Sequence, residues 1–291
     1  MKGFPVPKEQ RVPRDLWDRA PWNRWSFQHI REILPTTEVW RGSGPVWQLG
    51  ENPVDLDPIS FGSQSGQATT VIDWLAQNFA DGILVLHEGE IRYERYFNDM
   101  TARTLHLSQS MAKSVTSAVA GILVSRGQLD PEEQITTYLP ELTQTGWKGA
   151  KLRHALDMTS GVRYVEDYEA LDSDMAATDV ASGWRSAKPD VPYFQCIWDQ
   201  ILSLTESVRG HGEVFEYRSI ETEVLGHCME RVTQTPLAEL ISCELWQPLG
   251  VEESACFTVD GAGYPLADGG FNATLRDYAR FGEMLCNDGT A

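Results

Sequence analysis

The chain lacks a long apolar run, and it also lacks the features of a secretion signal. No stretch of about 18 consecutive apolar residues occurs, so no segment is predicted to span a membrane. The first residues, MKGFPVPKEQRVPRDLWDRAPWNRW, contain no continuous apolar core of the kind that a secretion signal needs. We therefore expect neither a membrane anchor nor export.

Paired cysteines and metal-binding motifs are also missing. The five cysteines are odd in number, widely spread and without a CxxC pair, which is typical of reduced thiols in a cytoplasmic protein. The six histidines show no HExxH spacing. The sequence therefore predicts a cytoplasmic protein with no metal and no organic cofactor.

Positive charge is scarce. Acidic residues number 42 against 24 basic ones, for a net charge of -18. Such a chain repels phosphate backbones, so nucleic acid is not an expected partner. Hydrophobic residues make up 42% of the 291 residues, enough for a sizeable core in one large domain or two lobes.

The first part of the chain predicts an irregular wrap followed by an α/β region. Residues 1–70 are rich in Pro, Gly and Trp, with one short helix expected over 25–33. A short amphipathic helix follows over 71–79. The run GILVLHEGEIRYERYF then predicts a β-hairpin that turns at Glu88-Gly89.

The rest of the chain reads as mostly helical. No strand is expected between 130 and 267, and a helix that opens with a capping pair of Thr274 and Asp277 comes near the end. We therefore predict an α/β lobe made of 1–129 and 268–291, interrupted by a mainly helical lobe of 130–267. Further helices are expected at 110–126, 152–158, 191–206, 220–233 and 236–245.

The segment LHLSQSMAKSVTSAVAGILVSRG places a lysine where a cation is disfavoured. Lys113 falls in the first turn of a predicted helix, at the positive end of the helix dipole, and small apolar residues follow it. Burial and the dipole both lower a lysine pKa, and Ser110 lies one turn away on the same face. A neutral amine beside a hydroxyl is a general base beside a nucleophile. The alternative is a lysine that reaches solvent, since S-x-x-K arises about once by chance in a chain of this length.

A second candidate element lies about a hundred residues later, in GHGEVFEYRSIETEVLGHCMERV. Tyr217-Arg218-Ser219 precedes a predicted helix. The Tyr217 hydroxyl would share the proton relay with Lys113, and Ser219 would hydrogen-bond to either of them. The alternative is a buried aromatic ring whose hydroxyl bonds to the backbone.

Together these elements resemble the serine β-lactamase and penicillin-binding-protein superfamily, in which S-x-x-K follows a β-hairpin and Y-x-S comes later. The segments SQSMAKSVTS, HALDMTSGVRYVEDY, FEYRSIETEVLG and GGFNATLRDYARFGEML are similar to its class C-related branch. That branch includes carboxylesterases, D-aminopeptidases and 6-aminohexanoate-dimer hydrolases, which cleave a nylon-oligomer amide. The Trp-rich start and the YVEDY…SGWR loop are most similar to the last group, over about residues 15–290.

The resemblance implies a β-lactamase-like fold, an antiparallel sheet flanked by helices with a large helical insertion. It implies that Ser110 forms the acyl-enzyme, Lys113 takes its proton and Tyr217 passes a proton to the leaving group. The backbone N–H of Ser110 would supply half of an oxyanion hole. In the implied substrate loop, 164–184, Tyr168 would contact the scissile amide and Asp179 a substrate ammonium. Six acids crowd this loop, and a solvated acidic surface is the alternative for most of them.

One motif of the superfamily is not found. No KTG occurs, and HGE at 211–213 precedes Tyr217 instead of following it. We expect the third motif and the C-terminal strands of the fold to lie beyond Ala291 and to pair with the 83–97 hairpin. That leaves only two sheet strands expected in this chain.

The sequence therefore predicts a serine hydrolase that cleaves a small-molecule amide or ester through an acyl-enzyme, most readily an amide of the 6-aminohexanoate-dimer type. One alternative is a promiscuous carboxylesterase or β-lactamase-like hydrolase of the same fold. Another is a non-catalytic ligand-binding or scaffold homologue without the third motif. A homodimer is a possible assembly.

Overall fold

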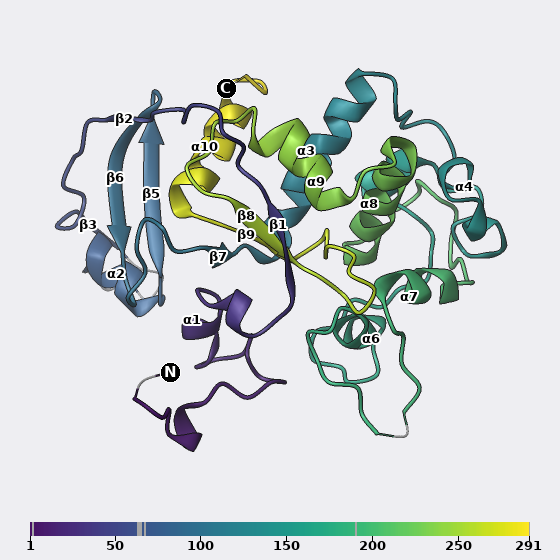
Figure 1. Ribbon diagram of the computed structural model, residues 1–291, viewed down its shortest axis with the longest axis horizontal. Coiled ribbons are helices and arrows are strands. Elements are labelled where there is room, and N and C mark those ends of the chain that lie inside the picture. Colours follow the sequence, from purple (N-terminus) through teal and green to yellow (C-terminus); the bar gives the residue numbers. More distant parts are fainter. Residues whose placement is uncertain (2, 63–65, 67, 190, 291) are drawn as a thin grey trace.

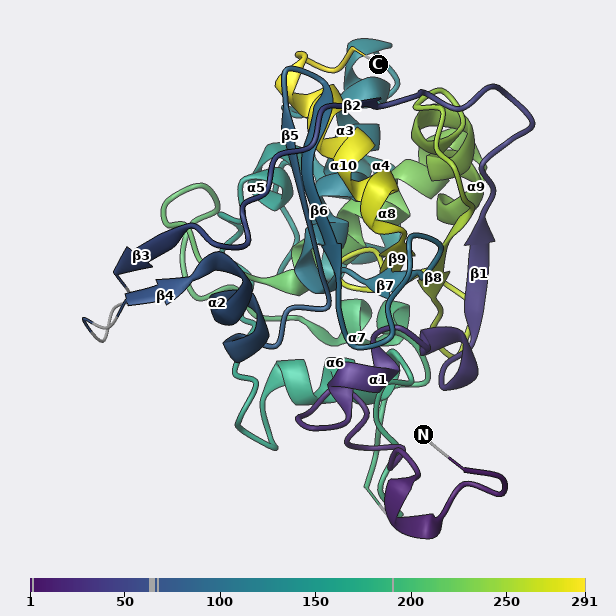
Figure 2. The ribbon, with the colours of Figure 1, turned by 90° about the vertical axis from the view of Figure 1, so that its left-hand side faces the viewer.

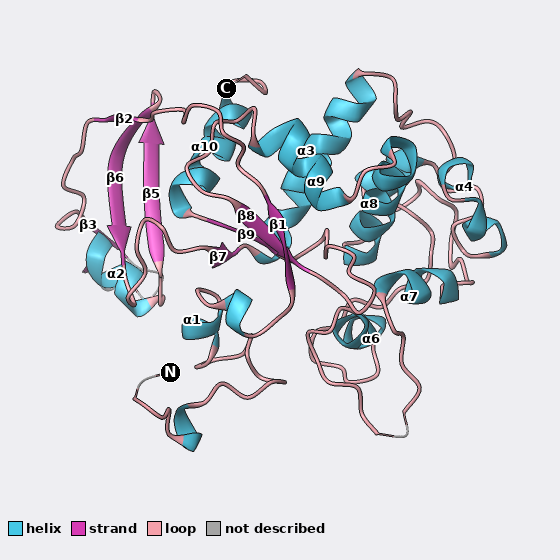
Figure 3. Ribbon diagram, in the orientation of Figure 1, coloured by secondary structure: helices cyan, strands magenta, loops and turns pink. Residues whose placement is uncertain are grey.

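The computed structural model describes residues 1, 3–62, 66, 68–189 and 191–290. A three-stranded sheet stands at one side, a four-stranded sheet crosses the middle, and most helices gather at the other side (Figure 1). Figure 3 shows the same division by element type, with mainly helices and loops to the right of the central sheet. The sequence prediction of an antiparallel sheet flanked by helices is confirmed by the central sheet.

The predicted hairpin forms the outer sheet. Strands β5 (Gly82–His87) and β6 (Glu90–Tyr96) pair antiparallel around Glu88 and Gly89, both of which have positive φ. The short strand β2 (Gly50–Glu51) runs parallel to β6 on its other edge. In the described part of the chain, no strand pairs with the free edge of β5.

The central sheet has the order β1-β8-β9-β7, with every neighbouring pair antiparallel. Its strands are β1 (Thr36–Val39), β7 (His106–Leu107), β8 (Ala255–Thr258) and β9 (Phe271–Ala273). The expectations of only two sheet strands, and of no strand between 130 and 267, are therefore wrong. Both β8 and β9 are short and buried along their whole length, so they lack the apolar–polar alternation that marks a half-buried strand.

Two helices pack against each other in the core. Helix α3 (Ala112–Ser125) is entered through a 3-10 turn over Gln109–Met111 and buries an apolar stripe that includes Val115, Val119 and Leu123. Helix α8 (Ser219–Thr233) contacts α3. It is also contacted by α4 (Ile135–Tyr138), α5 (Leu152–Leu156), α7 (Ile197–Ser203) and α9 (Leu237–Ile241). Because neighbours surround α8, even its charged residues Glu221 and Glu223 are buried.

Helix α10 (Leu275–Cys286) packs against β5 and begins as predicted, with the Thr274 hydroxyl accepting a hydrogen bond from the Asp277 backbone N–H. Figure 2 shows α10 beside the hairpin sheet.

The helix predicted over 191–206 begins later, at Ile197, because the chain around Pro192 is not helical. The helix predicted over 25–33 is split in two. The remaining elements are η1 (Lys8–Gln10), α1 (Asn23–Ser26), η2 (Ile30–Glu32), β3 (Ser60–Gly62), β4 (Ala68–Thr70), α2 (Val71–Gln77), α4 (Ile135–Tyr138), η4 (Pro140–Gln144), α5 (Leu152–Leu156), α6 (Asp174–Ala181), α7 (Ile197–Ser203), α9 (Leu237–Ile241) and a π-helical turn, η5 (Ser242–Trp246).

The N-terminal wrap is attached to the loop after α6. Trp17 is fully buried, its Nε1 donates to the carbonyl oxygen of Trp184 at 3.0 Å, and the two rings meet edge to face. Arg185 donates to Asp18 at 2.7 Å. These contacts bring residues from the start of the chain to the wall of the cleft described below.

Two further facts concern the whole described chain. All five cysteine thiols are free. Among the described helices, none is both long enough and apolar enough to cross a membrane.

Candidate active site

Ser110 and Lys113 meet at the start of α3. The turn that carries Ser110 is fixed to the central sheet, because the backbone N–H of Ser108 donates to the carbonyl oxygen of Phe271 at 2.9 Å. Gln109 has a φ of 51°, a left-handed conformation that costs energy in a non-glycine residue and often marks a functional turn. Ser110 is exposed, and Lys113 Nζ lies 3.2 Å from its Oγ. The structure thus brings a hydroxyl and an amine into hydrogen-bonding contact.

The Lys113 side chain is only 11% exposed, and its amine has several partners besides Ser110. It donates to the backbone carbonyl of Asp268 at 2.9 Å and lies 3.7 Å from the Asp268 carboxylate. It also lies 5.1 Å from the centre of the Tyr217 ring. The three residues proposed from the sequence as a catalytic group therefore converge in space.

The expectation that Lys113 is neutral near pH 7 is wrong. Burial does lower the pKa of its amine, but the negative charge of Asp268 and hydrogen bonding to Tyr217 outweigh that effect, so the pKa is raised. Sequence reasoning saw the burial and the helix dipole. It missed Asp268, which is 155 residues away along the chain.

Asp268 is itself paired with a second buried acid, Glu223 of α8. The Asp268 backbone N–H donates to Glu223 Oε1 at 2.8 Å. Burial, together with the charge and hydrogen bonding of Asp268, raises the pKa of Glu223 well above its usual range. Burial and the neighbouring Asp268 thus both favour the neutral form of Glu223. Sequence reasoning singled out neither residue; the available signal was an acid within the apolar stripe of a predicted helix.

Ser219 does not contact Lys113 or Tyr217 as expected, because Glu166 takes its hydrogen bonds. The Ser219 hydroxyl donates to Glu166 at 2.6 Å, and its backbone N–H donates to the same carboxylate. Tyr168 also donates its hydroxyl to Glu166. Glu166 thus caps the N-terminus of α8, where a negative charge is favoured, so this acid is not part of a solvated surface.

A cleft of about 320 Å³ opens beside Ser110. Four of the six residues proposed from the sequence line it, namely Ser110, Tyr168, Asp179 and Ser219. The other lining residues are Asp18, Arg19, Gln109, Met175, Thr178, Ser182, Trp184, Leu266, Asp268 and Gly269. Residues from the N-terminal wrap, the 164–184 loop and the Ser110 turn therefore line the same cleft.

Asp179 lies in this cleft with an internal cation nearby. Its carboxylate is 3.7 Å from Arg185, which also pairs with Asp18. Burial raises the pKa of Asp179 to about 6; Arg185 opposes the rise, while Asp18 and Asp268 add to it. Three carboxylates thus surround the cleft, and only one of them carries a short ion pair to Arg185.

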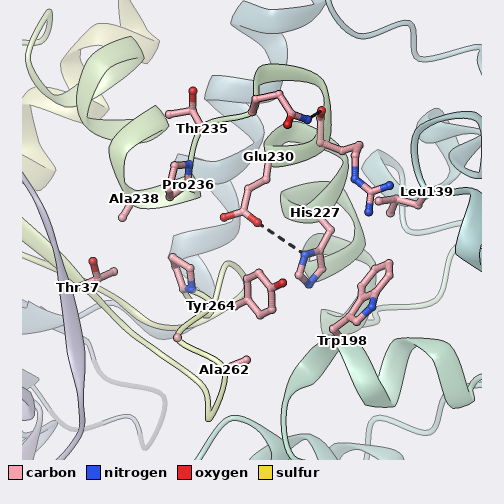
Figure 4. A pocket seen from close by; sticks show the side chains of 14 residues that line it. Thr37, Leu139, Trp198, His227, Glu230, Thr235, Pro236, Ala238, Ala262 and Tyr264 are labelled. Carbon is pink, nitrogen blue, oxygen red and sulfur yellow. Dashed lines mark hydrogen bonds and ion pairs between the residues drawn. The ribbon is translucent and has the colours of Figure 1, made fainter.

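A second cavity, of about 560 Å³, lies at the end of α8 (Figure 4). His227 points into it between the rings of Trp198 and Tyr264, each 4.8 Å away, and lies 3.8 Å from the carboxylate of Glu230. Burial lowers the pKa of His227 to about 4. No serine or cysteine is among the residues that line this cavity. In the described part of the chain, no group of three or more His, Cys, Asp and Glu side chains could hold a metal ion.

The fold and the Ser110–Lys113 turn define a recognised class of protein. The beta-lactamase family model matches residues 75–290, and the chain belongs to that family. Within it, the chain is 34% identical over 280 residues to a 6-aminohexanoate-dimer hydrolase of Paenarthrobacter ureafaciens, a match that covers 95% of this chain and 68% of the relative.

Two other relatives extend the comparison. A solved Bacillus anthracis structure, provisionally described as a 6-aminohexanoate-dimer hydrolase, superposes with a TM-score of 0.91 at 30% identity and covers 98% of this chain and 74% of the other. Protein Rv1367c of Mycobacterium tuberculosis is 29% identical over 229 residues, 66% of this chain and 56% of its own length. The chain thus spans between about half and three quarters of these relatives. The relatives support a hydrolase of the β-lactamase fold.

Proposed function

We propose that the chain is a serine hydrolase that cleaves an amide or ester through an acyl-enzyme on Ser110. The observation that carries this proposal is the 3.2 Å contact between Lys113 Nζ and Ser110 Oγ at the mouth of a cleft. In the first step Ser110 Oγ bonds to the acyl carbon while its proton passes to Lys113. Because the resting amine is an ammonium, this step requires that Lys113 first lose a proton to solvent, so activity rises with pH.

The remaining roles follow from position. Tyr217, next to Lys113, passes a proton to the leaving group, and water then releases the acyl group. The backbone N–H of Ser110 stabilises the oxyanion. Tyr168 lines the cleft and contacts the scissile group.

The substrate class that the cleft favours is an amide with a terminal ammonium, as in the 6-aminohexanoate dimer named for one relative. Asp179 places a carboxylate in the cleft, and Arg185, 3.7 Å from it, has its shorter ion pair with Asp18 at 2.7 Å. An ammonium at Asp179 would offset the cost of an ionised carboxylate in a largely buried position.

The direct test is covalent labelling with a fluorophosphonate probe, followed by mass mapping of the modified peptide. We expect a single adduct on Ser110 that is lost in Ser110→Ala. Ser117→Ala is the matched control, because Ser117 lies two turns further along α3, is exposed and bonds only to its own helix. Labelling that survives Ser110→Ala would contradict the proposal, and no labelling at all would favour a non-catalytic homologue.

A matched amide and ester with the same acyl group would separate the amidase from the esterase of the same fold. Amide cleavage depends on protonation of a poor leaving group, so it tests the Tyr217 role, whereas an activated ester does not. We expect Tyr217→Phe to lower amide turnover more than ester turnover. Equal losses would favour a carboxylesterase.

A further inference from the structure

Two buried carboxyl groups are stacked behind the amine of Lys113. Asp268 is 5% exposed and lies against Lys113 through both its carbonyl and its carboxylate. Glu223 is 4% exposed and accepts the backbone N–H of Asp268. The Oδ1 atom of Asp268 is buried without a conventional donor among the described residues. The catalytic roles proposed above do not use this pair.

The charges of Asp268, Glu223 and Lys113 balance one another if one of the two carboxyl groups is protonated. Two carboxylates this close in a buried site cannot both ionise, so one of them retains a proton. Burial and the charge of Asp268 raise the pKa of Glu223, so we assign that proton to Glu223. A proton on Glu223 also supplies the donor that the Asp268 carboxylate otherwise lacks. The pair then presents one negative charge to the one positive charge of Lys113, which avoids the cost of an unmatched buried charge.

We propose that Asp268, held by Glu223, is a positioning residue for Lys113 that anchors the amine beside Ser110 and controls its protonation. Its kinetic consequence rests on the proposed function, whereas its effect on the charge of Lys113 does not. The Asp268 carbonyl and the Ser110 hydroxyl both accept from the amine, so they fix the direction in which it points.

Each neighbouring element contributes a group to this control. The loop between β8 and β9 supplies Asp268, the loop before α8 supplies Tyr217, and the 164–184 loop supplies Glu166. Of these three, Asp268 has the strongest electrostatic effect on Lys113. Glu223 acts on Lys113 through Asp268. Replacing Asp268 with a neutral isostere should therefore let the amine lose its proton at a lower pH.

The first test observes Lys113 directly. The chain has only six lysines, so isotope-labelled lysine gives few side-chain NMR signals, and Lys113→Arg identifies the one that belongs to Lys113. In the wild type we expect this amine to titrate above the ordinary lysine range, and in Asp268→Asn at a lower pH. An unchanged titration in a folded Asp268→Asn protein would overturn the proposal, whether or not the chain is an enzyme.

The matched control is Asp260→Asn. Asp260 is also a buried acid of the β8–β9 loop, but it bonds to backbone N–H groups, including that of Ile197 at 2.9 Å, and not to Lys113. Its loss should lower stability and leave the Lys113 titration in place. A shift of equal size in both variants would mean that the effect is structural, and this would also overturn the proposal.

The second test measures kcat/KM against pH with an activated aryl ester, whose leaving group needs no proton. Asp268→Asn should move the acidic limb to lower pH, and each pH unit of movement raises the rate on that limb about tenfold. Glu223→Gln should leave the limb near its wild-type position, because an amide replaces a neutral acid that donates to Asp268. A limb that stays in place in Asp268→Asn, with Ser110 still labelled, would refute this inference alone. If Ser110 is not labelled and the ester is not cleaved, the proposed function fails, and the NMR titration still decides the inference.

Discussion

The Ser110 cleft and the second cavity each hold an ionisable side chain that is largely removed from water. Lys113 in the Ser110 cleft is 11% exposed, and His227 in the second cavity is 10% exposed. Nevertheless, the pKa of Lys113 is raised, which favours its charged form, whereas the pKa of His227 is lowered, which favours its neutral form. Lys113 keeps its charge because Asp268 faces it, whereas burial and the charge of Arg231 lower the pKa of His227 and favour its neutral form.

The difference shows what burial alone can do. In the second cavity, the neutral imidazole of His227 packs between the rings of Trp198 and Tyr264. Glu230 caps α9 by accepting the backbone N–H of Leu237 at 2.7 Å. In the cleft, the opposite charges of Lys113 and Asp268 lie beside the exposed hydroxyl of Ser110. A perturbed titration is thus a guide to chemistry only when it occurs next to a group that can react.

The largest expected difference between the Ser110 cleft and the second cavity is in the rate of hydrolysis. Ser110→Ala should lower hydrolysis of a chromogenic ester by at least about a thousandfold, because the covalent step is lost. His227→Gln should leave the rate close to that of the wild type. Initial rates of the two purified variants check this, with circular dichroism to show that both are folded. A His227→Gln enzyme as inactive as Ser110→Ala would mean that the second cavity takes part in catalysis.

Lys113→Arg should lower the same rate by about a hundredfold to ten-thousandfold, because a guanidinium stays protonated and cannot accept the Ser110 proton. The positive charge opposite Asp268 is retained, so the loss should appear in kcat without unfolding. Lys151→Arg, at an ion pair with Glu132 away from the cleft, is the control and should be silent. A Lys113→Arg enzyme within about tenfold of the wild type would remove Lys113 from the proposed role.

Stability should depend on pH in opposite ways at the two places. Burial raises the pKa of Glu221, in the first turn of α8 beside Ser160 and Arg218, to about 7. Its contribution to stability is therefore full below about pH 4.5 and is lost as pH rises through about 7. His227, with a pKa lowered to about 4, contributes fully above about pH 6.5 and loses this as pH falls through about 4. Each effect is on the order of 3 kcal/mol.

Denaturant unfolding between pH 4 and pH 7 measures both effects. Relative to the wild type, Glu221→Gln should gain stability as pH rises, and His227→Gln should lose it. Glu239→Gln, an exposed acid on α9, should follow the wild-type curve. Slopes of the same sign in the two variants would show that Glu221 and His227 do not differ as described.

The smallest expected effect concerns substrate charge. Asp179→Asn should raise KM about tenfold for an ester with a terminal ammonium and leave a neutral ester of the same length unchanged. The difference should fade below about pH 6, where the wild-type carboxylate is itself protonated. Asp172→Asn, an exposed acid in the same loop, should show neither effect. Equal KM changes for both esters would indicate a loss of shape and not of charge recognition.

Local signals in the sequence predicted the elements that depend on local interactions. The hairpin turn at Glu88-Gly89, the stripe of α3 and the Thr274 cap each involve residues a few positions apart, and all three are found. The S-x-x-K spacing likewise fixes the contact between Ser110 and Lys113, because one helical turn separates them.

The parts that were missed depend on distant partners. Asp268 and Glu223 act on Lys113 across long stretches of chain, and nothing near either residue indicates this contact. Glu166 read as one of several solvated acids, although it caps α8, because the start of that helix lies 53 residues further on. Strand β8 was missed because a short strand that is buried on both faces has no periodic pattern. The boundary drawn between the two lobes remains a prediction.

The attachment of the N-terminal wrap has a consequence for the order of folding. Asp18 and Arg185 face each other across a separation of 167 residues, and both belong to the wall of the cleft or support it. During synthesis, Asp18 and Trp17 must wait until the loop after α6 has been made, so the cleft is completed late and through contacts of high sequence separation. A ligand in the cleft would contact residues from both ends of this long stretch of chain, because Asp18 and Trp184 both line the cleft. It should therefore slow the opening of the wrap and act as a folding ligand as well as a substrate.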